Sequence, residues 1–471
     1  MIFTATPIAG GHSDAVRAFI YELDRRRVVL VEIEGGAHHG AIDTASGAVT
    51  ERAAKIAGEL GLPLVIVVDS SGADITEGVS ALHAWGRFAR VLAGLSGVVP
   101  IIMGVTGACV SGPALLLGLA DHVVMTTESF AYVSAPDQVR AFTAESTDAL
   151  SLGGATVHAT TSGLAALVVD DDDLLDTLAT LLEYLPDHHL DDPPIAPCPD
   201  PIDRSTARAE AVVPTEATKS YNVIDVIDDV VDADSFLELH PHHAPNLVVG
   251  YARLGGRPIG VVANQPRARA GTLDIAASLK GARFVQSCDA FNLPLVTFVD
   301  TPGYEPGRDL EWRGIIRYGA QLVHAYAAAT VPRLGVVLRK AYGGAYIVMD
   351  SRGIGNDWCA AWPSAQIAVM GASGAVQILH GRELRLAEVS EAEASGTDSV
   401  DGEGSGAAGR RQELESEYEA AFLNPQVAER RGYVDEVIDP VDTRRLLAGA
   451  LARFSTKRDH QPQRRHANQP L

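Results

Sequence analysis

The chain has 471 residues and a formal net charge of −22, with 46% hydrophobic and 21% charged residues. This composition is typical of a globular protein that is long enough for two or three domains. The acidic charge argues against nucleic acid and anionic membranes as partners, although a local basic pocket can still bind a phosphorylated small molecule.

Targeting and metal-binding signals are missing from the sequence. No apolar run approaches the roughly 18 residues of a membrane-spanning helix, and the N-terminus lacks the pattern of a secretory signal. We therefore expect a cytoplasmic protein without a membrane partner. The four cysteines are far apart and form no CxxC pair, so we expect no disulfide framework and no metal site in this chain.

Strand and helix signals alternate along the first part of the chain. Apolar runs at 28–33, 63–68 and 100–105 predict buried strands, and helical apolar spacing at 50–60 and 75–95 predicts the helices between them. The alternation predicts an α/β protein with right-handed crossovers.

The composition changes after residue 186, where prolines and acidic residues accumulate. Six prolines between Pro193 and Pro214 predict a linker, which we place at 191–214. The alternating pattern resumes beyond it, with strands expected at 247–254, 258–263, 294–299 and 331–338 and a helix at 273–291.

The domain organisation follows from this change of composition. We expect an N-terminal domain, a linker, a C-terminal domain and a polar, disordered tail, at residues 1–190, 191–214, 215–456 and 457–471.

An internal repeat relates the two halves of the chain. The string Leu-Pro-Leu-Val occurs at 62–65 and again at 293–296, and each copy leads to an Asp-Ser or Asp-Thr pair, at 69–70 and 300–301. A Val-Pro pair opens the next strand in both copies, and its proline follows the first proline by 37 residues in one copy and 38 in the other. These landmarks predict two copies of one domain.

The stretch Arg339 to Met349 holds the first candidate site. An apolar run leads into Gly343-Gly344 between two tyrosines, and an apolar segment that can open a helix follows. The first N–H groups of a helix lack intrahelical partners and lie at the positive end of its dipole, which suits an oxyanion hole. A tight packing turn is the alternative interpretation. The repeat places Ser111-Gly112 opposite Gly343-Gly344 to within one residue, which favours a pair of matched functional turns.

The sequence resembles the carboxyltransferase (β) subunits of biotin-dependent acyl-CoA carboxylases of the acetyl-/propionyl-CoA type. The resemblance is dense from 258 to 384 and looser in the N-terminal half, where the chain also starts late relative to the family. Its most specific strings are Asp-Thr-Pro-Gly-Tyr at 300–304, Gly-Ile-Ile-Arg at 314–317, Arg-Lys-Ala-Tyr-Gly-Gly-Ala-Tyr at 339–346 and Ala-Trp-Pro at 361–363.

The resemblance implies two tandem crotonase-like (ClpP/crotonase) domains and a homo-oligomer, a hexamer built as a trimer of dimers. It implies transfer of the carboxyl group of carboxybiotin to the α-carbon of acetyl-CoA or propionyl-CoA, giving malonyl-CoA or methylmalonyl-CoA. The biotin nitrogen takes the α-proton, so no protein base is required. The chain has neither a Met-Lys-Met biotinylation site nor a Gly-rich ATP-grasp signature, so biotin must come on a separate, biotinylated α subunit.

The resemblance also implies roles for particular residues. The C-terminal turn, Gly343, Gly344 and Ala345, would hold the biotin oxyanion, and the N-terminal turn, Val110, Ser111 and Gly112, would hold that of the thioester. The residues expected to bind biotin or substrate are Tyr342, Tyr346, Ile347, Gly303, Tyr304, Gly72 and Ala73. An apolar residue at Ile347 resembles enzymes that accept acetyl-CoA as well as propionyl-CoA; a core isoleucine without a role in selection is the alternative.

The N-terminal half departs from the family pattern. Asp74 stands where relatives have arginine, which exchanges a possible phosphate partner for a repelling charge. Val110, Ser111 and Pro113 stand in place of alanine, glycine and alanine, and Pro113 has no N–H.

Three hypotheses follow. The first is the carboxyltransferase of an acyl-CoA carboxylase, and the second is carboxyl transfer to, or decarboxylation of, a non-standard acyl substrate in a specialised pathway. The third is a non-catalytic subunit of a hetero-oligomeric carboxylase.

Overall fold

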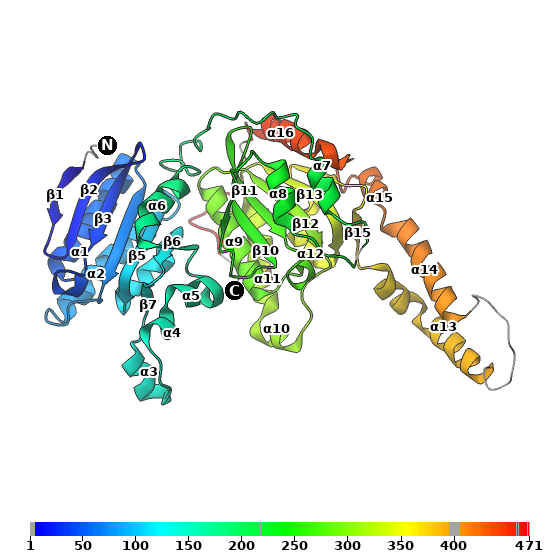
Figure 1. Ribbon diagram of the computed structural model, residues 1–471, viewed down its shortest axis with the longest axis horizontal. Coiled ribbons are helices and arrows are strands. Elements are labelled where there is room, and N and C mark those ends of the chain that lie inside the picture. Colours follow the sequence, from blue (N-terminus) through cyan, green and yellow to red (C-terminus); the bar gives the residue numbers. More distant parts are fainter. Residues whose placement is uncertain are drawn as a thin grey trace. The chain divides into compact units, whose positions relative to one another are not determined.

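The computed structural model describes residues 5–216, 218–394, 406–457, 459, 461–468 and 470 (Figure 1). Two eight-stranded sheets dominate these residues, and helices connect their strands. The predicted α/β class is confirmed.

The first sheet has the strand order β1-β2-β3-β4-β5-β6-β8, with β7 paired to β5. The first three strands are antiparallel, and the pairs from β3 onward are parallel. Its strands are β1 (Thr6–His12), β2 (Val16–Leu23), β3 (Arg26–Ile33), β4 (Leu64–Ser70), β5 (Ile101–Val110), β6 (His122–Thr126), β7 (Phe130–Tyr132) and β8 (Leu167–Val169). The three predicted strands are present, whereas the sequence patterns missed the others, because short or half-exposed strands lack a continuous apolar run.

The second sheet repeats this order as β9-β10-β11-β12-β13-β14-β16, with β15 paired to β13. Its strands are β9 (Leu237–Leu239), β10 (Leu247–Leu254), β11 (Arg257–Asn264), β12 (Leu295–Thr301), β13 (Arg333–Tyr342), β14 (Trp358–Ala361), β15 (Gln366–Ala368) and β16 (Glu436–Val437).

The pairing register confirms the duplication residue by residue. Ser70 of β4 pairs with Cys109 of β5, and Thr301 of β12 pairs with Ala341 of β13. Each sheet then adds its short strand at the same place, because β7 pairs with residues 108–110 of β5 and β15 with residues 340–342 of β13. Cys109 and Ala341 are therefore equivalent positions, and the residues that follow them can be compared one by one.

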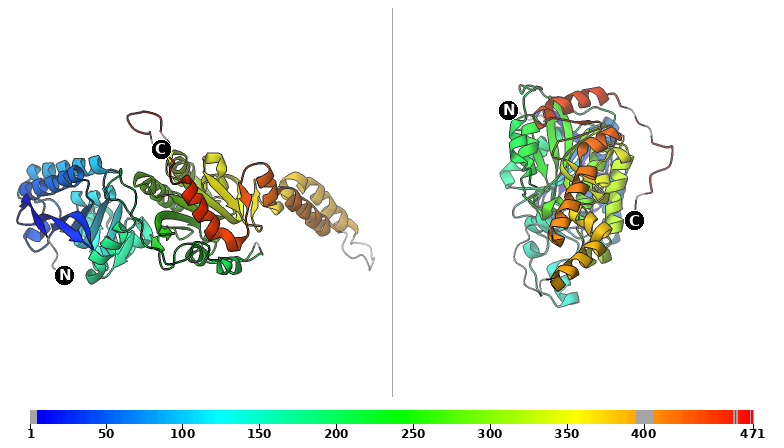
Figure 2. Two further views of the ribbon diagram at one scale, coloured as in Figure 1. Left: turned by 90° about the horizontal axis from the view of Figure 1, so that it is seen from above. Right: turned by 90° about the vertical axis from the view of Figure 1, so that its right-hand side faces the viewer.

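Two long helices, α1 (Thr44–Leu60) and α2 (Val79–Leu95), lie side by side next to the first sheet (Figure 2). Asp43 caps α1 by accepting a hydrogen bond from Ser46 N at 2.6 Å, and Gly61 ends it in the left-handed region. A Cβ on Gly47 would lie 2.5 Å from that of Ala84, so glycine permits the close approach of the two helices. Their apolar faces, with the strands, form the core of this part of the molecule.

The other helices connect and flank the strands. They are α3 (Pro136–Thr143), α4 (Ala149–Gly153), α5 (Ala155–Val157), α6 (Leu174–Leu182), α7 (Ala207–Val212), α8 (Val223–Val230), α9 (Ile275–Ala290), α10 (Arg308–Arg313), α11 (Ile315–Ala328), α12 (Gly343–Val348), α13 (Ala372–Ala394), α14 (Ala407–Phe422), α15 (Pro425–Arg430) and α16 (Thr443–Phe454). In Figure 1, α13 and α14 run side by side as a hairpin that extends away from the second sheet.

The chain separates into two compact units. Unit 1 contains the residues up to Cys198 together with Ser235–Gly260 and Arg283–Pro294; unit 2 contains Pro199–Asp234, Val261–Ala282 and the residues from Leu295 onward. These units do not correspond to stretches of sequence, so the predicted domain limits at 190 and 215 stay a prediction.

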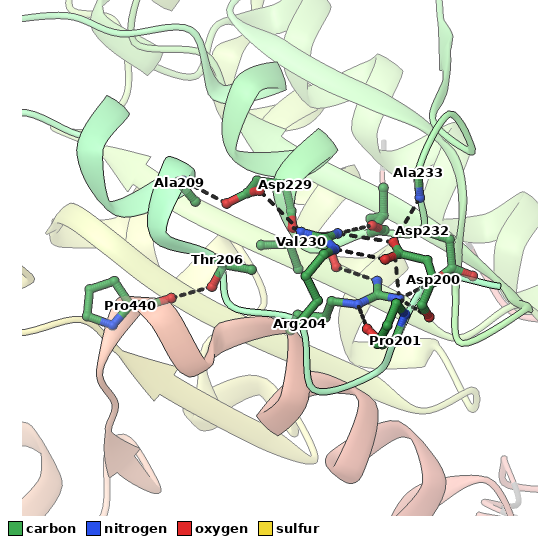
Figure 3. Close-up of polar contacts among 12 residues, drawn as sticks. Asp200, Pro201, Arg204, Thr206, Ala209, Asp229, Val230, Asp232, Ala233 and Pro440 are labelled. Carbon is green, nitrogen blue, oxygen red and sulfur yellow. Dashed lines mark hydrogen bonds and ion pairs between the residues drawn. The ribbon is translucent and has the colours of Figure 1, made fainter. Parts of the chain in front are cut away.

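The segment predicted as a linker is anchored along its length. It contains α7, and from Pro199 on it is part of unit 2, where Arg204 donates to Asp200 at 2.9 Å and to the Asp229 carbonyl at 2.9 Å (Figure 3). Buried Arg444 donates to the carbonyl of Pro201 at 3.0 Å and to Asp232 at 2.7 Å. Prolines deny this segment a regular ladder of hydrogen bonds, and charged side chains satisfy its backbone instead.

The end of the chain also makes defined contacts. Lys457, the first residue of the predicted disordered tail, has a side chain that is 8% exposed and donates to Asp357 at 2.9 Å. Residues 458, 460, 469 and 471 of that tail lie outside the described residues.

Among the helices described, none combines the length and apolarity needed to cross a membrane.

Candidate functional site

The C-terminal turn joins β13 to α12 as the sequence predicted. The strand ends at Tyr342, and Gly343, with φ of +60°, begins the helix. This positive φ is one that a residue with a Cβ rarely adopts. Apart from its chain neighbours and the backbone of its own helix, no described heavy atom lies within 4 Å of the position that a Cβ would occupy on Gly344, so the space above the first helical turn is open. The N–H groups of that turn have no intrahelical partners.

A buried carboxylate fixes the strand that carries this turn. Oδ1 of Asp300 accepts a hydrogen bond from Lys340 N at 3.0 Å, and its Oδ2 accepts one from Nε of Arg339 at 3.1 Å. Both side chains are buried. Burial raises the pKa of Asp300, and the Arg339 charge opposes that effect.

The Arg339 guanidinium also fixes a loop beneath the turn. It donates to the carbonyls of Glu216 at 3.0 Å and Lys219 at 2.8 Å, and its Cζ lies 5.3 Å from the centre of the Tyr221 ring. One side chain thus joins the end of β12, the end of β13 and the loop before α8.

An apolar cavity of about 460 Å³ lies beside the C-terminal turn. Arg431 contributes the single charge among its described lining residues. The walls come from α12, β15, α14, α15 and the loop after α15: Gly343, Gly344, Tyr346, Ile347, Ile367, Ala368, Val369, Tyr418, Phe422, Val427, Ala428, Arg431 and Tyr433. Ile347 is 43% exposed, so it is a residue of the cavity wall rather than of the buried core.

The tyrosines around the turn are held in their protonated form. Burial raises the pKa of Tyr342 and of Tyr304 to about 12 and raises the pKa of Tyr346 further. The Tyr342 hydroxyl also forms a hydrogen bond with Oε1 of Gln366. These phenols can therefore donate hydrogen bonds at neutral pH, but they cannot serve as bases.

Gly303 and Tyr304 lie at the end of β12, next to the start of α9. The Gly303 carbonyl accepts a hydrogen bond from Leu273 N at 3.1 Å, and Tyr304 forms a parallel bridge with Leu273. A Cβ on Gly319 of α11 would lie 3.1 Å from the Tyr304 hydroxyl, so glycine leaves room for the ring. Neither residue lines the described cavity.

The N-terminal turn occupies the equivalent place in the first sheet. Because Cys109 is equivalent to Ala341, Ser111 is equivalent to Gly343 and Gly112 to Gly344. The backbone agrees, since φ is +65° at Ser111 and +60° at Gly343. A serine in this region is strained, which indicates that the surrounding structure imposes the turn.

The hydrogen-bond donors of the two turns differ. Ser111 N donates to the Tyr132 carbonyl at 2.9 Å, so its N–H is already satisfied. The register places Pro113 opposite Ala345, and proline offers no N–H. Gly112 is also more enclosed than Gly344, because a Cβ there would lie 2.9 Å from the Trp85 ring. Gly112 therefore offers the N–H of this turn that corresponds to Gly344.

Gly72 and Ala73 lie close to the N-terminal turn. A Cβ on Gly72 would lie 3.0 Å from the Val110 carbonyl oxygen, and Ala73 forms a parallel bridge with Ile42. The Asp74 side chain forms a local hydrogen bond, in which its Oδ1 accepts from Thr76 N at 2.8 Å.

A second cavity, of about 360 Å³, lies beside this turn. Its described walls combine backbone, aromatic rings and polar side chains: Gly35, His39, Asp69, Ser71, Ala108, Val110, Phe130 and Tyr132. The rings of Phe130 and Tyr132 stack at 5.5 Å between centroids. His39 is exposed and also lines this cavity. Nowhere in the described residues do three His, Cys, Asp or Glu side chains gather as metal ligands do.

Sequence reasoning used Asp69 and Asp300 as landmarks of the repeat and gave them no role. Asp69 Oδ1 accepts a hydrogen bond from Ala108 N at 2.9 Å, as Asp300 does from Lys340 N. The sequence did hold a signal for this role, because an aspartate recurs at the end of a buried strand in both copies. A carboxylate at such a place needs a fixed hydrogen-bond donor.

Comparison with known proteins agrees with this architecture. The carboxyl transferase domain family matches residues 20–469. The chain is 44% identical over 416 residues to the carboxyltransferase subunit of propionyl-CoA carboxylase from Haloferax mediterranei, covering 88% of this chain and 77% of that protein. It is 41% identical over 431 residues to the human mitochondrial propionyl-CoA carboxylase beta chain, covering 90% and 75%.

A solved structure shares the whole architecture. The transcarboxylase 12S hexamer, with methylmalonyl-coenzyme A and methylmalonic acid bound, aligns with a TM-score of 0.91 at 38% identity, over 97% of this chain and 85% of that one. Two copies of one α/β fold, together with this likeness, define a carboxyltransferase with duplicated crotonase-like domains. The chain belongs to the carboxyl transferase family, as its sequence motifs predicted.

Proposed function

We propose that the protein is the carboxyltransferase component of a biotin-dependent acyl-CoA carboxylase that acts on propionyl-CoA or acetyl-CoA. The observation that carries the proposal is the pair of equivalent strand-to-helix turns, each beside a cavity, on two copies of one fold. The reaction develops negative charge on two carbonyl-type oxygens, and a duplicated turn supplies donors for both.

The C-terminal cavity suits biotin. Its walls are apolar, as the bicyclic ring requires, and the open space above Gly344 lets a ureido oxygen approach the first N–H groups of α12. Carried on a separate subunit, carboxybiotin supplies the carboxyl group and a nitrogen that accepts the α-proton of the thioester. The N–H groups of Gly344 and Ala345 are the donors that stabilise negative charge at this site.

The N-terminal cavity suits the acyl thioester. Gly112 supplies a backbone N–H for the thioester oxygen, and Gly72 and Ala73 border the same turn. Ile347 lies on the wall of the other cavity. We assign it to acyl-chain selection because the resemblance implies active sites between the N-terminal domain of one subunit and the C-terminal domain of another. Tyr342, Tyr346, Gly303 and Tyr304 shape the surroundings of the C-terminal turn, and none is a proton acceptor at neutral pH.

Partners follow from the chemistry and from the relatives. The chain requires a biotinylated carrier subunit, since we find no biotinylation motif in the sequence. The transcarboxylase 12S protein forms a hexamer, and we propose the same assembly here, in the cytoplasm. Light scattering on the purified protein should give roughly six times the 49.7 kDa chain mass.

Reconstitution tests the function directly. The purified chain, mixed with a biotinylated biotin carboxylase/carrier subunit, ATP and labelled bicarbonate, should transfer label to propionyl-CoA or acetyl-CoA. Omitting this chain while keeping the carrier is the control. Label that reaches biotin but no acyl-CoA would refute the assignment. The close match of nearly the whole chain to carboxylase subunits favours this hypothesis over a non-standard acceptor or a non-catalytic subunit.

A further inference from the structure

Each copy of the fold has an aspartate at the same position, and the surroundings of the two aspartates differ. Asp69 and Asp300 occupy equivalent positions, because each lies one residue before the Ser70–Cys109 or Thr301–Ala341 pair. Each holds its neighbouring strand by accepting a backbone N–H on Oδ1, at 2.9 Å and 3.0 Å. This shared bond is the structural role of the residue.

The second oxygen of the carboxylate has different surroundings in the two copies. Oδ2 of Asp300 accepts a hydrogen bond from Arg339. The residue equivalent to Arg339 is Gly107, and no Lys, Arg or His of the described residues forms an ion pair with Asp69. A carboxylate whose counter-charge is missing can accept further hydrogen bonds.

Two glycines leave room for the Asp69 carboxylate. A Cβ on Gly107 would lie 2.4 Å from Oδ1, and a Cβ on Gly35 would lie 2.1 Å from Oδ2. Any larger residue on either side would fill the space of the carboxylate or displace it. The carboxylate lines the cavity beside the N-terminal turn, together with the stacked rings of Phe130 and Tyr132.

We propose that the Asp69 carboxylate accepts a hydrogen bond from an amide N–H of the pantetheine arm of the acyl thioester. The inference rests on the proposed function, which places the thioester at this turn. A CoA arm carries two secondary amides close to its sulfur, and their N–H groups are neutral donors that must be satisfied when they leave water. A carboxylate beside aromatic walls favours such a donor and repels the phosphate groups at the far end of CoA.

The variant Asp69→Asn separates this role from the structural one. Asparagine keeps an acceptor for Ala108 N, so the strand contact is retained, and its NH₂ group then occupies the place of Oδ2. A donor there cannot accept an amide N–H. Asp74→Asn is the matched control, because it removes the same charge from a carboxylate that does not line the cavity.

Binding to the full-length protein, measured by calorimetry, is the test. The probes are propionyl-pantetheine and its two derivatives in which one amide nitrogen or the other is methylated. We expect methylation of one amide to weaken binding to the wild-type protein and to Asp74→Asn by about tenfold or more, as a hydrogen bond to a charged group requires. In Asp69→Asn the same methylation should change affinity by less than about twofold, since such a cycle isolates the pairwise interaction.

Two outcomes overturn the proposal. Equal losses on methylation in the wild type and Asp69→Asn would show that Asp69 does not bind the amide. No binding of any thioester to the wild-type protein would overturn the proposed function itself and this inference with it. If Asp69→Asn fails to fold, as judged by its thermal transition, Gly35→Ala takes its place, because the added Cβ would lie 2.1 Å from Oδ2 and must displace that oxygen.

Discussion

Single residues distinguish the two turns more sharply than their backbone does. Ser111 and Gly343 share a positive φ, yet Pro113 removes the N–H that Ala345 offers. Gly344 is open above its Cα, whereas Gly112 lies against Trp85. The biotin side of the proposed enzyme therefore has the complete set of donors, and the thioester side has a reduced one.

Replacing Pro113 with alanine should restore a donor to the N-terminal turn. Since one oxyanion donor is worth about 100-fold in rate at a fully formed site, we expect kcat/KM for propionyl-CoA to rise several-fold. Stability should fall by about 0.4–1 kcal/mol, because the unfolded chain gains freedom. Steady-state kinetics of the reconstituted enzyme check this, with Pro136→Ala as the control. An unchanged kcat/KM would show that a backbone N–H at position 113 does not contribute at this turn.

Replacing Gly344 with alanine should slow carboxyl transfer without loss of stability. The added methyl group meets no protein atom within 4 Å, so it fills the space that we assign to biotin. Alanine also favours the helical conformation by up to about 1 kcal/mol. We expect carboxyl transfer to fall at least tenfold while the thermal midpoint holds or rises. Gly374→Ala in α13 is the control, and a fully active Gly344→Ala protein would contradict the assignment.

At the scale of elements, the positions of strands and helices depend on a few buried polar side chains. Arg339 of β13 forms hydrogen bonds with the end of β12 and with the loop before α8. Arg333, six residues earlier on the same strand, forms an ion pair with Asp350 beyond α12 at 2.9 Å. Both ion pairs are buried, so removing one partner leaves an uncompensated charge.

The variants Arg339→Met and Arg333→Met should separate these two anchors. Each should cost about 3–5 kcal/mol of unfolding free energy, because a buried carboxylate loses its partner. Hydrogen exchange should rise at residues 214–216 and 218–221 in Arg339→Met but not in Arg333→Met. Arg339 donates to the carbonyls of Glu216 and Lys219, whereas Arg333 donates to Asp350 and to the carbonyls of residues 354 and 355. Arg339→Lys keeps the charge and should recover part of the stability. Equal exchange at this loop in both methionine variants would contradict the role given to Arg339.

At the scale of the molecule, buried titratable groups make the free energy of unfolding of unit 1 depend on pH. Burial lowers the pKa of His122 to about 3, and its Nε2 lies 2.8 Å from the Tyr251 hydroxyl. The neighbouring Asp121 has its pKa raised to about 6 by burial. The unfolded chain takes up a proton at His122 near pH 6.5 and the folded chain does not, so this group removes stability as pH falls from 6.5 toward 3. Asp121 acts in the opposite sense between pH 6 and 3.8, because its folded form binds the proton first.

The variant His122→Gln should therefore relieve acid sensitivity. We expect its stability relative to wild type to rise by about 2 kcal/mol between pH 7.5 and pH 5, since each unit below 6.5 is worth about 1.4 kcal/mol. Denaturant unfolding at several pH values measures this change. His83→Gln, at an exposed site on α2, should show a constant difference. A pH-independent offset in His122→Gln would show that His122 does not cause the loss of stability at low pH.

The sequence by itself determined the class, the duplication and the C-terminal turn. Continuous apolar runs identify buried parallel strands without further information. The pairs Asp-Ser and Asp-Thr recur because, in both copies, they stand at the end of the equivalent strand, where the aspartate binds the neighbouring strand. The strings around Gly343-Gly344 were specific enough to indicate carboxyl transfer. Such features are local, so the order of residues alone contains them.

Only the tertiary structure decided how the two turns correspond and what surrounds them. Pairing of Ser70 with Cys109 and Thr301 with Ala341 removed the one-residue ambiguity and placed Pro113 opposite Ala345. The structure also shows that Arg339 forms an ion pair with Asp300, whereas Gly107 stands at the equivalent position beside Asp69, which lines a cavity. These contacts join residues about 40 positions apart, and strand register, which no local pattern specifies to a single residue, sets which of them meet.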